Sequence, residues 1–298
     1  DGRDVFFLTG MDEHGEKVAE AAAAHGMTPQ EWCDSQVTQF TELWRALDIT
    51  NDDFIRTTQP RHVKGVQDFM QKLHDNGYLY KGTYDGYYCT PCETQFTEGD
   101  LVDGKCPDCG REVKVIHEEN WFFKLSEFGD KLLAYYDEHP NFIRPQIREN
   151  EIRSFIEGGM HDLSVSRTGF DWGIPLPFDP EHVTYVWVDA LINYLTALGY
   201  GSDDTTLLER FWPANFHFVG KDFIRFHCVI WPAMLMAAGM ECPRHVFAHG
   251  FLMAADGSKM SKSKGNALYP RDLIERYGVD AYRYYFGSDV TFGSDANI

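Results

Sequence analysis

The chain has 298 residues, of which 43% are hydrophobic and 24% are charged, as in an ordinary globular protein of one large domain or two smaller ones. Its formal net charge of −19 argues against a domain built mainly to grip nucleic acid, because such domains usually carry a basic surface. The longest apolar run, from Cys228 to Met240, is interrupted by Pro232 and is too short to cross a membrane.

The first quarter of the chain predicts a buried strand followed by helices. Val5–Leu8 is a continuous apolar run, typical of a strand covered on both faces, and a polar loop follows from Met11 to Gly15. Thr28-Pro29-Gln30-Glu31 has the capping-box pattern with proline at the first helical position. We therefore expect helices over residues 16–25, 28–47 and 61–76.

The sequence pattern changes at Tyr78, where glycines, tyrosines and paired cysteines replace the helical periodicity. Asp85-Gly86 is a hairpin turn signal. Helices resume over 127–138 and 146–157, and strands are expected at 184–189, 216–219 and 246–253, with helices to 198, over 223–238 and at the end of the chain. Apolar strands separated by helices predict an α/β fold with a doubly wound, Rossmann-like parallel sheet, interrupted by an insertion over 78–157.

The cysteines give the strongest local signal. Cys89-x-x-Cys92 and Cys106-x-x-Cys109 are separated by 13 residues. Two such chelating turns can meet around one tetrahedral ion, and four thiolates favour a closed, structural Zn²⁺ site. Buried free thiols or a redox pair are the alternatives. Seven cysteines without a disulfide pattern suit a reducing compartment such as the cytoplasm.

The segment 256–266 carries three lysines and three serines between two glycines, directly after an expected strand. It is either a solvated loop or a loop that delivers ammonium and hydroxyl groups to phosphates. The Gly-x-x-x-x-Gly-Lys-Ser/Thr cradle of common NTPases is not in the sequence, so ATP would need this other device.

Lys259-Met260-Ser261-Lys262-Ser263 resembles the signature loop of class I aminoacyl-tRNA synthetases, in sequence and in placement after the last strand. The segments 5–15, 166–175, 185–194 and 218–227 resemble the methionyl-tRNA synthetase family, although Met11 stands where threonine is usual. The resemblance covers nearly the whole chain. It implies that methionine reacts with ATP, which binds together with Mg²⁺, to form methionyl-adenylate. The methionyl group is then transferred to tRNA(Met).

The resemblance also implies roles for individual residues. Lys259 and Lys262 would neutralise the departing pyrophosphate, and Asp12 would pair with the α-ammonium group of methionine. The methionine pocket would be formed by Trp187, Ala190, Leu191, Tyr194, Phe226 and His227. ATP would be bound by Gly220, Asp222, His249, Lys259, Ser261 and Lys262. Without the resemblance, Asp12 reads as a loop cap, Asp222 as a helix cap, and the stripe through Trp187 as ordinary core.

The other class I signature, His-x-Gly-His, is not in the chain. We therefore expect a fragment that also lacks the anticodon-binding domain and has little or no ligase activity alone. The expected divisions are a first catalytic part (1–77), the connective insertion with its zinc knuckle (78–157), a second catalytic half (158–266) and the start of a helical region (267–298). The alternatives are the leucine, valine, isoleucine or cysteine enzyme, a nucleotidylyltransferase, or a zinc-knuckle module without catalysis.

Overall fold

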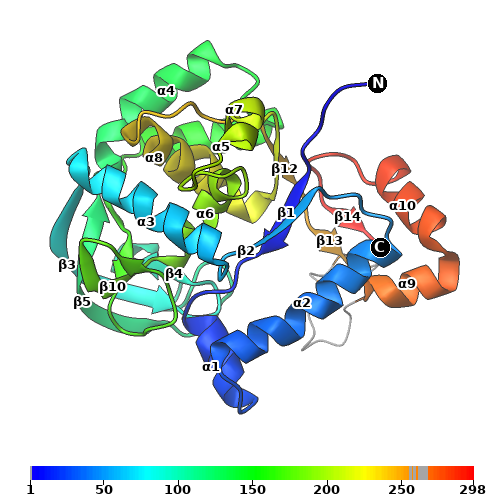
Figure 1. Cartoon of the computed structure of the whole chain (residues 1–298), viewed down its shortest axis with the longest axis horizontal. Helices are drawn as coiled ribbons and strands as arrows, with labels where there is room; N and C mark the ends of the chain where they lie inside the picture. The colour runs from blue at the N-terminus through cyan, green and yellow to red at the C-terminus, as the bar shows by residue number, and fades with distance from the viewer. Residues whose placement is uncertain (1, 255–256, 258–259, 261–267) are drawn as a thin grey trace.

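A computed structural model describes residues 2–254, 257, 260 and 268–298. Two sets of parallel strands lie at its centre (Figure 1). β1 (Leu8–Met11) pairs with β2 (Asp53–Arg56), and β11 (His217–Gly220) pairs with β12 (Val246–His249). β6 (Ile143–Arg144), from within the range expected as an insertion, pairs with the other edge of β12. The predicted α/β fold with parallel sheets is confirmed.

The N-terminal helices lie where the sequence placed them. α1 spans Glu16–Ala24, α2 spans Pro29–Ala46 and α3 spans Pro60–Asp75. The capping box forms as predicted, because Thr28 Oγ1 accepts a hydrogen bond from the Glu31 N–H and the Thr28 N–H donates to the Glu31 carboxylate. The local capping signal therefore located the start of α2.

The strand predicted at Val5–Leu8 is wrong. Pairing begins at Leu8 and runs to Met11, whereas Val5 is 70% exposed. The Phe7 N–H binds the side chain of Asp52, although the Phe7 carbonyl accepts from the Asp52 N–H. Apolar character alone did not locate the ladder, since Thr9 and Gly10 carry its middle rungs opposite Phe54 and Ile55.

An antiparallel sheet with strand order β4-β3-β5-β7 takes three strands from the insertion and its edge strand β7 from the segment that follows it. The turn predicted at Asp85-Gly86 is wrong: both residues lie inside the long strand β3, and Gly86 pairs with Ile116. Glycine is needed there for a close approach, because a Cβ would lie 2.8 Å from the carbonyl oxygen of Phe96. The strands are β3 (Leu79–Cys89), β4 (Thr94–Phe96), β5 (Lys114–Phe123) and β7 (Leu163–Ser164).

The strand predicted over 184–189 is also wrong. β10 (Asp179–Thr184) ends there, and α6 (Val186–Thr196) begins after Tyr185 in an extended conformation. A short apolar run does not distinguish a strand from the first turn of a buried helix. β10 lies between β8 (Ser166–Arg167) and β9 (Pro175–Leu176) in a small antiparallel sheet.

The helix predicted over 223–238 is present but irregular. It comprises η3 (Lys221–Phe223), the π-helical turn η4 (Phe226–Ile230) and α8 (Trp231–Ala237). Pro232 has no N–H to donate to the Cys228 carbonyl, and the Tyr136 hydroxyl donates to that carbonyl instead, at 2.5 Å. A side chain from the insertion thus satisfies the backbone group that proline leaves free.

The strand predicted over 246–253 is divided at Gly250. A Cβ at that position would lie 2.1 Å from the Ser294 carbonyl oxygen. Beyond it, β13 (Leu252–Met253) pairs with β14 (Ala296–Asn297). The two expected closing helices are present, and the first of them lies beside α2 (Figure 1). An ion pair between Arg271 and Glu42, at 2.7 Å, joins it to α2. The closing helices are α9 (Pro270–Tyr277) and α10 (Val279–Ser288).

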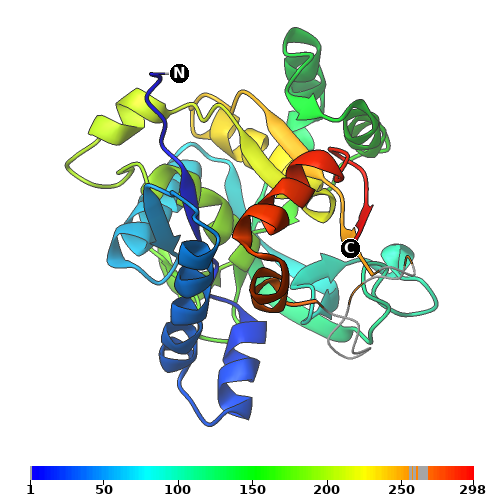
Figure 2. The same cartoon turned by 90° about the vertical axis from the view of Figure 1, so that its right-hand side faces the viewer.

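The remaining helices come from the insertion and from the segment before β11. α4 (Gly129–Glu138) and α5 (Gln146–Glu157) match the prediction, α7 (Thr206–Phe211) was not predicted, and η1 (Glu98–Asp100) and η2 (Leu125–Phe128) are short turns. In the view of Figure 2 the blue N-terminal helices and the cyan antiparallel sheet lie on opposite sides of α9 and α10. Across the described ranges, no helix combines the length and apolarity needed to cross a bilayer.

Candidate functional site

Asp12 directly follows β1, at the carboxyl end of a parallel strand, where α/β folds bind ligands. The residue keeps access to solvent. The protein packed around its carboxyl group nevertheless raises the pKa of Asp12 well above the ordinary value, and the negative charges of Asp189 and Glu93 raise it further. A ligand ammonium group placed here would relieve that repulsion. The electrostatics of the position thus suit a cation.

Asp189 on α6 is fully buried between two histidines. One carboxylate oxygen lies 2.6 Å from His14 Nδ1 and the other lies 2.6 Å from His62 Nε2. Burial alone would raise the pKa of Asp189, but the hydrogen bonds and charges of the two histidines outweigh it and hold that pKa below the ordinary value. This network joins the Asp12 loop to α6 and to α3.

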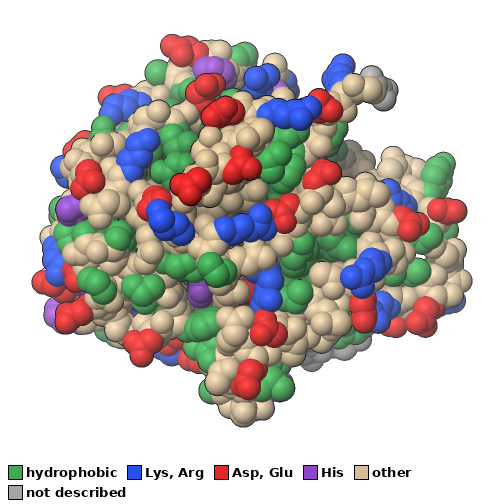
Figure 3. Space-filling view, in the orientation of Figure 1, with side chains coloured by type: hydrophobic (Ala, Val, Ile, Leu, Met, Phe, Trp, Pro, Cys, Tyr) green, Lys and Arg blue, Asp and Glu red, His purple; other side chains and the backbone are tan. Residues whose placement is uncertain are grey.

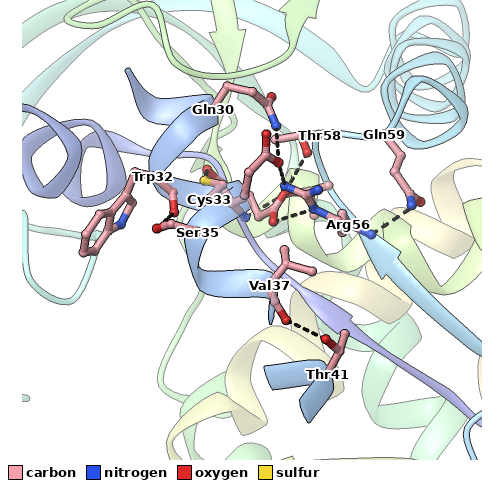
Figure 4. A network of polar contacts seen from close by, with 12 residues as sticks. Gln30, Trp32, Cys33, Ser35, Val37, Thr41, Arg56, Thr58 and Gln59 are labelled. Carbon is pink, nitrogen blue, oxygen red and sulfur yellow. Dashed lines mark hydrogen bonds and ion pairs between the residues drawn. The ribbon is translucent and has the colours of Figure 1, made fainter. Parts of the chain in front are cut away.

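A second network fixes the same loop from its other side (Figure 4). Arg56 Nε donates to the buried carboxylate of Glu13 at 2.8 Å, and Arg56 Nη2 donates to Asp34 at 2.6 Å. The Thr58 hydroxyl donates to the second oxygen of Glu13, and the Glu13 N–H donates to Thr57 Oγ1 at 2.9 Å. Neither network was predicted from the sequence, because both depend on strands and helices that are far apart along the chain.

The residues predicted for a methionine pocket come together from α6 and η4. The rings of Trp187 and Phe226 stack with centroids 4.5 Å apart, and the Tyr194 hydroxyl lies 2.8 Å from His227 Nε2. Leu191 is buried, whereas Ala190 is only partly covered, like Trp187, Tyr194 and Phe226. Helical spacing along α6 places these side chains on one wall.

His227 is neutral in this wall. Burial lowers its pKa to about 4. Its Nδ1 lies 3.0 Å from the Phe223 carbonyl oxygen and so carries the proton, which leaves Nε2 to accept the hydrogen bond from Tyr194. The wall is therefore aromatic and uncharged, which suits an apolar side chain such as a thioether.

The sequence did not point to His217, which stacks on Tyr194 with ring centroids 4.0 Å apart. Its pKa is lowered well below the ordinary value, mainly by burial. Its two ring nitrogens have no hydrogen-bond partner among the described residues. The strand β11 thus adds a neutral imidazole behind the pocket wall.

Three of the residues predicted to bind ATP, Gly220, Asp222 and His249, lie beside that wall. Gly220 and His249 end neighbouring parallel strands and face each other in register. A Cβ on Gly220 would lie 2.5 Å from Asp222 Oδ1. Glycine therefore leaves the backbone at this strand end uncovered by a side chain of its own. Asp222 and His249 are exposed, and Phe223 contacts Trp187 with ring centroids 5.3 Å apart. Lys259, Ser261 and Lys262 lie outside the described residues.

The four cysteines of the insertion form one cluster. All four sulfur atoms lie within 4.8 Å of one another, with Cys89 and Cys109 3.6 Å apart and Cys92 and Cys106 3.9 Å apart. Zn–S bonds of about 2.3 Å in a tetrahedron place sulfur atoms about 3.8 Å apart. The cysteines are free thiols, so the donor set and its spacing fit a tetrahedral metal ion.

Comparison with known proteins identifies the family of this chain. A family model described as "tRNA synthetases class I (M)" matches residues 1–115 and 110–298. The chain belongs to this family. Within it, the methionine–tRNA ligase of Caldanaerobacter subterraneus subsp. tengcongensis is 55% identical over 294 residues, and that of Thermotoga maritima is 53% identical over 301 residues. The rival families raised by the sequence are thereby set aside.

Solved structures agree with this family. The Mycobacterium tuberculosis methionyl-tRNA synthetase bound by methionyl-adenylate superposes with a TM-score of 0.95 at 47% identity, over 99% of this chain and 59% of that one. The apo form of the Mycobacterium tuberculosis enzyme gives a TM-score of 0.82 at 37% identity, over 98% of this chain and 63% of that one.

The synthetase relatives are longer than this chain. The match covers 99% of this chain and 46% of the Caldanaerobacter protein, and 100% of this chain and 48% of the Thermotoga protein. The chain thus spans about half the length of the curated relatives it matches.

Proposed function

We propose that the protein containing this chain activates methionine with ATP and transfers the methionyl group to tRNA(Met). The observation that carries this proposal is the neutral aromatic wall of Trp187, Phe226, Tyr194 and His227, built beside parallel strand ends within a family whose named relatives are methionine–tRNA ligases. A methionyl-adenylate complex of a relative with a TM-score of 0.95 supports it.

In this proposal the first step joins methionine to the α-phosphate of ATP. A carboxylate oxygen of methionine attacks that phosphorus and pyrophosphate leaves, so the protein needs to position reactants and stabilise charge rather than supply a nucleophile. Asp12 would pair with the α-ammonium group and the aromatic wall would receive the thioether. Gly220, Asp222 and His249 would contact the adenosine side.

Lys259, Ser261 and Lys262 complete the proposed ATP site, with Mg²⁺ accompanying the nucleotide. Ammonium groups near the departing pyrophosphate accelerate the reaction only where their contacts improve in the transition state. On the face shown in Figure 3, acidic and basic side chains are interspersed, so contacts with tRNA from this face would be local.

We assign Zn²⁺ to the four cysteines as a structural ion, because four sulfur ligands leave no coordination position open. The four divisions, 1–77, 78–157, 158–266 and 267–298, are kept as the proposed domain plan. Free thiols and thiolate metal ligands suit a reducing compartment such as the cytoplasm.

The test is ATP–pyrophosphate exchange by the full-length gene product, with methionine, leucine, isoleucine, valine and cysteine offered separately. We expect exchange with methionine at a rate at least about 100-fold above the others, because apolar pockets and buried polar groups together discriminate on this scale. Preference for another amino acid would refute the proposal.

A further inference from the structure

Glu93 directly follows the metal-ligand candidate Cys92 and carries unusual features for a glutamate. It has a left-handed backbone with φ of 52°, and only 8% of the residue is exposed. Its backbone carbonyl accepts hydrogen bonds from the Tyr185 hydroxyl at 2.6 Å and from the Trp187 indole N–H at 3.1 Å. The turn that bears the cysteines therefore holds the aromatic wall directly.

The carboxylate of Glu93 reaches a different element. Helix α1 begins after Gly15, which offers no side-chain cap, and the N–H of Lys17 donates to Glu93 Oε1 at 3.4 Å. A carboxylate at a helix start satisfies free N–H groups and interacts favourably with the helix dipole. Gly15 has φ of 104°, and a Cβ there would lie 2.1 Å from Oε1, so glycine makes room for this cap.

Glu93 thus contacts both elements that flank the proposed methionine site. Its carbonyl holds α6 through Trp187, and its carboxylate caps the helix that follows the Asp12 loop. Four thiolates around one ion would fix the turn from Cys89 to Cys92, since a metal at such a site supplies folding free energy to its ligands. Glu93, which follows Cys92, belongs to the same turn, because its N–H donates to the Thr90 carbonyl at 3.3 Å.

We propose that Glu93 is a positioning residue that couples metal occupancy of the four-cysteine cluster to the shape of the methionine side of the site. The inference rests on the proposed function and deepens it. Metal loss frees the turn, and the carbonyl and carboxylate of Glu93 then leave Trp187 and α1. Methionine affinity falls, while the adenosine side, formed by the ends of β11 and β12, is unchanged.

The experiment uses the full-length protein with Zn²⁺ bound, after removal of Zn²⁺ by a chelator, and as the Glu93→Gln variant. Dissociation constants for methionine and for ATP are measured separately by calorimetry, and backbone hydrogen exchange is followed in a peptide covering residues 13–20. We expect chelation to raise the methionine Kd about threefold to tenfold, as loss of hydrogen bonds of this kind does. Glu93→Gln should raise it by a smaller factor, about twofold to fivefold, because glutamine keeps the acceptor oxygen and the backbone carbonyl but removes the negative charge at the start of α1. Exchange in the peptide should accelerate, and the ATP Kd should stay within about twofold.

Two further variants sharpen the result. Glu112→Gln changes an exposed glutamate of the same insertion, which pairs with Lys105, and should leave both affinities and the exchange unchanged. Tyr185→Phe removes one donor to the Glu93 carbonyl and should raise the methionine Kd by a smaller factor than chelation. In Glu93→Gln, subsequent chelation should add less than it does in the wild type, because the two changes act on one coupling.

An unchanged methionine Kd and unchanged exchange after complete metal removal would overturn the inference. Equal loss of methionine and ATP affinity would also overturn it, since that result indicates general unfolding rather than positioning. A metal-loaded wild type that binds no methionine would instead refute the proposed function, and hydrogen exchange at residues 13–20 would still test the coupling.

Discussion

The carboxylate of Asp189 lies 2.6 Å from Nδ1 of His14, so the loop after the first parallel strand is bonded to the first turn of α6 across 175 residues of sequence. His62 Nε2 occupies the other carboxylate oxygen, and Thr196 Oγ1 lies 2.8 Å from its Nδ1. The loop that carries Asp12 and the helix that carries Trp187 are therefore joined through one buried polar network. Mutation of Asp189 tests whether this network stabilises the fold.

Asp189→Asn should destabilise the protein by about 3 kcal/mol, because an amide offers a donor where the carboxylate accepts from a histidine, inside a buried network. Urea unfolding measures this free energy. Asp68→Asn is the matched control, since Asp68 forms an exposed pair with Lys64 whose loss costs less than about 1 kcal/mol. Equal losses in the two variants would show that Asp189 is not central to the packing.

The neutral His227 predicts a specific pH dependence of stability. Its folded pKa of about 4 lies below the ordinary 6.5, so the unfolded chain binds more protons between these values. The contribution is fully present above pH 6.5 and is lost as pH falls toward 4, by about 3 kcal/mol in total. Unfolding free energies of wild type and His227→Gln measured from pH 7 to pH 4.5 should converge toward acid. Parallel curves would contradict a neutral His227.

Metal removal should affect the insertion first. We expect one zinc ion per chain by elemental mass spectrometry, and Cys106→Ser should bind zinc at least about tenfold more weakly. Chelation should make four additional thiols reactive, against the buried background of Cys33, Cys228 and Cys242. Cys33→Ser serves as the control with unchanged zinc content. Reactivity unchanged by chelation would argue for free thiols instead of a metal site.

Truncation of the aromatic wall should lower methionine affinity selectively. Trp187→Ala removes the ring stacked on Phe226, and we expect the methionine Kd to rise about 30-fold to 100-fold, as burial of a large side chain against a ring is lost. Trp32→Ala, on α2, removes a half-buried ring that stacks on His25 at the end of α1, and it should leave that Kd unchanged. Calorimetric titration of both variants distinguishes a binding wall from ordinary core.

Local patterns carried much of the fold. Capping and periodicity located α2, α4 and α5 to within a few residues, and the spacing of the cysteines anticipated their cluster. The strands were harder to predict, because β1 is only four residues long and three of the four residues of the apolar run Val5–Leu8 lie outside its ladder. The apolar run at the start of α6 is compatible with a strand as well as with a buried helix, and the choice depends on packing against distant parts of the chain.

The site was predictable only where a single element carries it. The spacing of Trp187 and Tyr194 along α6 showed one face of a helix, and η4 brings Phe226 and His227 onto it. Asp189, by contrast, acquires its role from histidines on two other elements, and Glu93 acquires its role from a turn conformation. Neither is visible in local sequence, since both depend on which elements meet in three dimensions.

The most direct test of the account is methionine-dependent ATP–pyrophosphate exchange by the full-length protein carrying Asp12→Asn. The account predicts a kcat/KM for methionine lowered about 100-fold to 1000-fold, the scale on which loss of one charged contact in an enclosed site acts, with the KM for ATP little changed. Asp75→Asn, at the exposed end of α3, should retain wild-type kinetics. Wild-type kcat/KM for methionine in Asp12→Asn would contradict the assignment of the ammonium site to this loop.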